Sequence, residues 1–124
     1  MVGESVGRIV MFHDAGLARR QMDGEPFTRL ADEIVSHLPE WVYISFDIDG
    51  LDPKLCPHTG TPVPGGLSFQ QATALFAAIV RAGKRIVGCD LSEVTPGPKG
   101  DEWDANVGAR VLYKMIGFAL LSQD

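Results

Sequence analysis

Short apolar runs alternate along the chain with longer segments in which apolar residues recur at helical spacing. Three runs rich in β-branched or aromatic residues predict strands at Arg8–Phe12, Val42–Phe46 and Arg85–Cys89. Their apolar residues do not alternate with polar ones, which is typical of strands buried on both faces. The pattern therefore predicts an α/β fold with a mainly parallel sheet covered by helices.

Three helices are predicted between and after these runs. Apolar residues recur at helical spacing from Phe27 until Pro39 ends the segment. Ser68 and Gln71 form a capping-box signal for a second helix. Asp104 is predicted to cap the last helix. The segment 50–66, rich in Pro and Gly, is predicted to be a long, ordered loop, and 92–103 is predicted to be a second, polar loop.

Composition narrows the classes of function. A chain of 124 residues predicts one domain, 1–124, and 45% hydrophobic with 22% charged residues is a globular composition. A net charge of −5 disfavours nucleic acid as a partner. Cys56 and Cys89 lack the spacing of a zinc site, which favours a reducing compartment. With no targeting or membrane segment recognised, we expect a cytoplasmic protein without a membrane partner.

Polar residues follow each predicted strand, at the edge of the sheet where ligands bind in such folds. His13 follows the first strand, Asp47 and Asp49 the second, and Asp90 and Glu93 the third. Asp47 and Asp49 are two residues apart in an extended chain, so their carboxylates are predicted to project to the same side. Two carboxylates aimed at one point suit a cation such as Mg²⁺ or Mn²⁺.

Each of these residues also has a plain structural interpretation. The Asp-x-Asp-Gly stretch can be turn chemistry, in which Asp47 and Asp49 cap backbone amides. Glu93 suits a bidentate guanidinium, but it can also be a solvated loop residue. His13 is a candidate metal ligand or base, although a single histidine after a strand is more often hydrogen-bonded at the rim. His58 is interpreted as a loop residue without a chemical role.

Four segments resemble the ureohydrolases, the arginase and agmatinase family. They are SFDIDGLDP (45–53), PHTGTPVPGGLS (57–68), DLSEVTPG (90–97) and EWDANVGARVLYK (102–114). The order and spacing of the first three also match, and the fourth resembles the closing helix of bacterial agmatinase-like members. The chain is thus similar to the C-terminal portion of such an enzyme.

The resemblance implies a three-layer α/β/α fold, here with about three strands and three helices. It also implies a binuclear Mn²⁺ centre whose hydroxide attacks a guanidinium carbon and releases urea. Asp47 would then bridge the metals, Asp49 would bind one of them, and the two would serve catalysis through that hydroxide. Thr61 and Glu93 would contact the guanidinium end of an agmatine-like or arginine-like substrate.

The family's GGDH and DAHxD segments, which supply its other metal ligands, do not occur in this sequence. We therefore expect weak or absent Mn²⁺ and no turnover by the 124-residue chain alone. A catalytically incomplete ureohydrolase-like domain is the alternative. A haloacid-dehalogenase-like phosphatase, suggested by FDIDG, is a third and poorer match. Earlier strands of the family are missing too, so we expect exposed strand edges and self-association.

Overall fold

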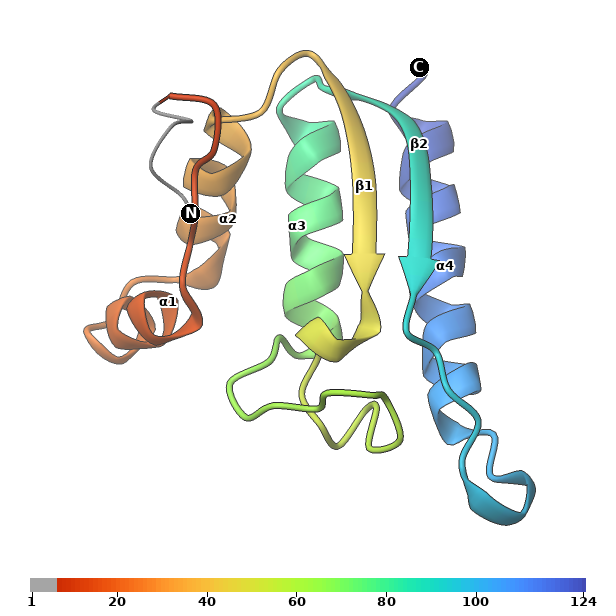
Figure 1. Cartoon of the computed structure of the whole chain (residues 1–124). Coiled ribbons are helices and arrows are strands. Elements are labelled where there is room, and N and C mark those ends of the chain that lie inside the picture. The colour runs from red at the N-terminus through yellow and green to blue at the C-terminus, as the bar shows by residue number, and fades with distance from the viewer. Residues whose placement is uncertain (1–6) are drawn as a thin grey trace.

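The computed structural model describes residues 7–124, which form four α-helices and a two-stranded sheet (Figure 1). Helices α1 (Asp14–Met22) and α2 (Phe27–Ser36) precede strand β1 (Trp41–Asp47) and the 3₁₀ turn η1 (Ile48–Gly50). Helix α3 (Phe69–Arg81) leads to strand β2 (Arg85–Ser92), and the 3₁₀ turn η2 (Pro98–Gly100) precedes α4 (Trp103–Leu121). The predicted α/β class is confirmed.

The two strands run parallel, with Trp41 paired to Arg85 and Asp47 paired to Ser92. A register shift lies between Val42 and Tyr43. A parallel pair needs a long crossover connection, and α3 provides it. Ser68 caps α3 with the predicted capping box, since it accepts from the Gln71 N–H while the Gln71 side chain accepts from the Ser68 N–H.

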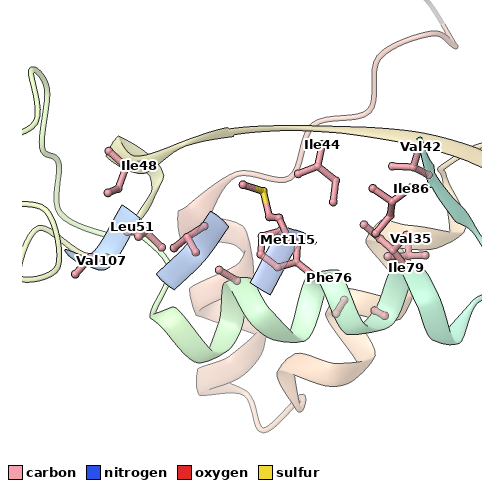
Figure 2. Packing of buried hydrophobic residues seen from close by; sticks show 14 of the residues in the cluster. Val35, Val42, Ile44, Ile48, Leu51, Phe76, Ile79, Ile86, Val107 and Met115 are labelled. Atoms are coloured by element: carbon pink, nitrogen blue, oxygen red, sulfur yellow. The ribbon is translucent and has the colours of Figure 1, made fainter. Parts of the chain in front are cut away.

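The core lies between one face of the sheet and helices α3 and α4 (Figures 1 and 2). Val42 and Ile44 of β1 point into it, as does Ile86 of β2. Phe76 of α3 lies at its centre, with its ring 5.7 Å from that of Phe46. Helix α2 packs beside α3 and contributes buried side chains, among them Leu30, Ala31 and Val35.

The opposite face of the sheet is open in the described part of the chain. Trp41, Tyr43 and Val87 lie on it, each with at least 60% of its surface exposed. The described residues thus form two of the three expected layers, because α3 and α4 cover the same face (Figure 1). None of the described helices is long and apolar enough to cross a membrane.

The predicted strand at Arg8–Phe12 is wrong, so the sheet has two strands and not about three. Ile9, Val10 and Met11 are more than half exposed and pair with no described strand. A strand exists only through its hydrogen-bonded neighbour, and this run has none. Helix α1, which follows it, was not predicted, and the described chain therefore has four α-helices and not three.

Candidate functional site

Asp47 ends β1 and turns the chain out of the sheet. Its backbone is extended, and its Oδ1 accepts a hydrogen bond of 2.9 Å from the Asp49 N–H, which caps η1. Asp49 lies inside this 3₁₀ turn, so the prediction of two carboxylates spaced along an extended strand is wrong. The capping contact is the turn chemistry that Asp-x-Asp-Gly also indicated, and it uses one oxygen of Asp47.

Asp49 is held by Thr61, which lies in the long loop after η1. Both the backbone N–H of Thr61, at 3.1 Å, and its hydroxyl donate to Asp49 Oδ2. The hydroxyl contact is the main cause that lowers the pKa of Asp49, while burial opposes it. The side chain is therefore held as a carboxylate, an acceptor and not an acid.

The second oxygen of this carboxylate is unusual. Asp49 Oδ1 is buried and has no hydrogen-bond partner among the described residues. Leaving a charged oxygen shielded from water without a hydrogen-bond partner is unfavourable. A bound cation would stabilise an oxygen of this kind. Asp49 Oδ1 is therefore an atom that could bind a cation, and the metal role of Asp49 stays a prediction.

The rest of a metal site is not found in residues 7–124. No group of three or more His, Cys, Asp or Glu side chains in this range could hold a metal ion. Asp47 and Asp49 are therefore at most part of a ligand set. His13 does not extend it, because it is exposed at the start of α1 and makes no capping hydrogen bond. Without a strand at Arg8–Phe12, it does not lie at a strand end.

Glu93 and Thr61 come together from two different loops. Glu93 follows β2 with a left-handed backbone, φ 65°, which is uncommon for a residue other than glycine. A Cβ placed on Gly60, the neighbour of Thr61, would lie 3.5 Å from Glu93 Oε2. The Glu93 carboxylate thus lies against the loop that carries Thr61. Glu93 thus lies close to Gly60, the neighbour of Thr61, and the substrate roles of Glu93 and Thr61 stay predictions.

The glycines of the Thr61 loop have a structural reason. The loop closes on itself by two hydrogen bonds of 2.8 Å, from Leu67 N–H to Gly50 O and from Asp52 N–H to Leu67 O. A Cβ at Gly66 would lie 2.2 Å from the Leu51 backbone, so only glycine permits this closure. The segment predicted as an ordered loop is therefore fixed at its base.

Sequence reasoning missed the contact between His58 and Asp104. Asp104 is fully buried in the first turn of α4, and Glu102, not Asp104, is the N-cap. Its Oδ2 accepts from the His58 backbone N–H and its Oδ1 lies 2.9 Å from His58 Nδ1. One signal was present in the sequence. Asp104 shares the helical spacing of the buried residues Val107, Val111 and Met115, where a solvated cap does not belong.

A family comparison covers most of the chain. The sequence model of the arginase family matches residues 9–117. N(1)-aminopropylagmatine ureohydrolase from Thermus thermophilus is 44% identical over 86 residues, which are 69% of this chain and 28% of that protein. Guanidinobutyrase from Pseudomonas aeruginosa is 44% identical over 75 residues, which are 60% and 23% of the two chains.

Solved structures agree with the sequence relatives. A hypothetical agmatinase from Burkholderia thailandensis superposes with a TM-score of 0.74 and 29% identity. The alignment covers 95% of this chain and 35% of that one. The chain thus spans about a quarter of the length of the two relatives above and about a third of this structure. The matched residues include the β1 and β2 ends with Asp47, Asp49, Thr61 and Glu93, and the chain belongs to the arginase family.

Proposed function

We propose that this chain supplies part of the active site of a manganese-dependent ureohydrolase that releases urea from an agmatine-like guanidino compound. The observation that carries the proposal is the carboxylate of Asp49, with one oxygen held by Thr61 and the other buried and free. The proximity of Glu93 to the same loop supports it. The alternative is a domain that has the same fold and does not turn over, which the incomplete ligand set favours.

Asp47 and Asp49 are the residues that would hold manganese. In the hydrogen bonds described, Asp47 uses only Oδ1, and Asp49 Oδ1 accepts none. Manganese, when bound in such sites, activates water at neutral pH and polarises the substrate as a Lewis acid. The protein's own contribution is to keep Asp49 ionised and oriented through Thr61, and the remaining ligands would come from outside residues 7–124.

Glu93 and Thr61 are proposed to receive the guanidinium. A carboxylate binds this planar cation through two parallel N–H···O contacts, which orients the carbon to be attacked. Thr61 would act from the opposite loop, and its hydroxyl is already oriented by Asp49. The relatives named above carry aminopropylagmatine and guanidinobutyrate in their names, and these compounds differ beyond the guanidino group. We therefore propose the guanidino group as the recognised part.

A manganese titration tests the proposal. We expect weak Mn²⁺ binding by the 124-residue chain, seen by electron paramagnetic resonance, that Asp49→Asn abolishes. Asp52→Asn is the matched control, because Asp52 lies in the same loop and only caps the Lys54 N–H. If Asp49→Asn binds Mn²⁺ as well as Asp52→Asn does, or more tightly, Asp49 is not a metal ligand. Complete absence of binding would favour the incomplete domain.

Urea release is the second test. With Mn²⁺ and agmatine or arginine we expect no measurable urea from this chain alone, because the ligand set is incomplete. Robust release that disappears in Asp47→Asn would contradict this expectation and would mean that another chain completes the site.

We also propose that copies of this chain associate. Each strand of the sheet has one neighbour, which leaves two free edges in the described part, and such edges recruit further strands. The open face adds Trp41, Tyr43 and Val87. Sedimentation over a concentration series should show association that Tyr43→Lys weakens. A monomer at all concentrations would contradict the proposal.

A further inference from the structure

The segment 56–61 connects the two loops of the candidate site to the core. At its start, the Cys56 thiol donates to Ile48 O at 3.2 Å, and the Thr59 hydroxyl donates to Cys56 O at 3.2 Å. At its end, Thr61 holds Asp49. Between these anchors lies His58, which makes the contact to α4 and so connects this segment to residues 46 positions further along the chain.

The contact between His58 and Asp104 is strong for a physical reason. Asp104 is 0% exposed, and a buried carboxylate is costly unless hydrogen bonds satisfy it. His58 gives it two, one from its backbone N–H and one from its ring, both at 2.9 Å. A carboxylate only accepts, so Nδ1 carries the proton in this contact. Loss of the ring would leave one buried oxygen of Asp104 without its donor.

The β2–α4 loop encloses the other side of the ring. His58 Nε2 lies 3.9 Å from Asp101 Oδ2. A Cβ on Gly97 would lie 2.8 Å from His58 Cε1, so the ring fits only because Gly97 has no side chain. Gly97 also donates its N–H to Asp101 O at 2.9 Å. This loop is the one that begins at Glu93, and its shape is therefore built around His58.

We propose that His58 and Asp104 are a positioning pair that sets Thr61 against Glu93. His58 is three residues from Thr61 in one loop, it is hydrogen-bonded to Asp104 at the start of α4, and its ring lies against Gly97 of the other loop. The described hydrogen bonds of Asp49 involve neither side chain, and only Glu93 lies within 4 Å of a Cβ on Gly60, so we assign the pair a positioning role. The functional meaning of the pair rests on the proposed ureohydrolase function, but its effect on the two loops does not.

The test compares His58→Ala, His58→Gln and the control His13→Ala. His13 is exposed and makes no capping contact, so its loss should change nothing. NMR measures the rate of hydrogen exchange at the Thr61 N–H, which donates to Asp49. The same experiment measures the exchange rates of the N–H groups in the β1–β2 ladder. We expect His58→Ala to speed exchange at Thr61 by about tenfold or more, with the ladder unchanged. His58→Gln, whose amide can still donate to Asp104, should restore part of the protection.

Two results would overturn the proposal. Unchanged exchange at Thr61 in His58→Ala would show that the loop does not depend on the ring. Equal acceleration at Thr61 and throughout the ladder would show a contribution to global stability alone. Because Asp104→Asn removes part of a buried pair and can fail to fold, the two His58 variants carry the decision. None of these measurements requires manganese or turnover. A failure of the proposed function would appear in the manganese titration and not in the exchange rates.

Discussion

Helices α1 and α3 show how differently two helices of one small protein are specified. Helix α3 has a capping box at Ser68 and buries Ala72, Phe76, Ala78 and Ile79. Helix α1 has no buried residue, and its first residue follows His13, which makes no capping hydrogen bond. Helix α3 was predicted from its apolar spacing and capping-box residues, and α1 was not, because apolar periodicity marks only helices that pack against a core.

Polar contacts hold α1 in place instead. Arg20 makes a hydrogen-bonded ion pair with Glu25, at 2.7 Å, and another with Glu33 of α2. Gln71 of α3 donates to Gln21 at 3.0 Å. Between α1, α2 and α3 remains a cleft of about 450 Å³, whose lining includes none of Asp47, Asp49, Thr61 and Glu93. Exposed ion pairs contribute little to stability because water and salt screen them, so α1 is the weakly attached element.

The largest effect should come from truncation in the core. Phe76→Ala should lower the free energy of unfolding by about 3–5 kcal/mol, because Phe76 is 4% exposed and its removal leaves a cavity. Leu17→Ala in α1 is the control and should change it by no more than about 0.5 kcal/mol. Denaturant unfolding measures both values. A similar loss in the two variants would mean that α1 is part of the cooperative core.

A smaller effect is expected at the helix N-termini. Ser68→Ala should cost about 1 kcal/mol, because the Gln71 N–H loses its acceptor. His13→Ala occupies the same position in α1 and removes no capping contact, so the thermal midpoint should stay unchanged. If His13→Ala lowers the midpoint as much as Ser68→Ala, the contrast between the two helices does not extend to their caps.

The smallest effect concerns pH. The Arg20 contact lowers the pKa of both Glu25 and Glu33 below the ordinary value of 4.5. Their stabilisation of α1 is therefore complete above pH 4.5 and is lost as the pH falls through the lowered values. NMR shifts of α1 should change in that acidic range before those of α3. Arg20→Gln should abolish the difference, and persistence of the difference in this variant would assign it to other groups.

The sequence predicted the elements that bury a face, namely α2, β1, α3, β2 and α4. It failed at Arg8–Phe12 because an apolar, β-branched run forms a strand only where a partner strand is available, and none pairs with it here. At the site, residue types indicated Asp49 and Glu93, but their approach to Thr61 and Gly60 depends on loop closure. The His58 contact joins residues 46 positions apart, which no local pattern encodes.

The parallel pairing of β1 with β2 has a consequence during synthesis. The last residue of β1 leaves the ribosome about 38 residues before Arg85, the first residue of its partner. At roughly 5–20 residues per second, β1 waits about 2–8 s for any hydrogen-bonded neighbour in the described sheet. Throughout that interval Val42, Ile44 and Phe46 are in a nascent chain without β2. The nascent segment from β1 to α3 is thus without its sheet partner, and open to chaperones, until β2 is made.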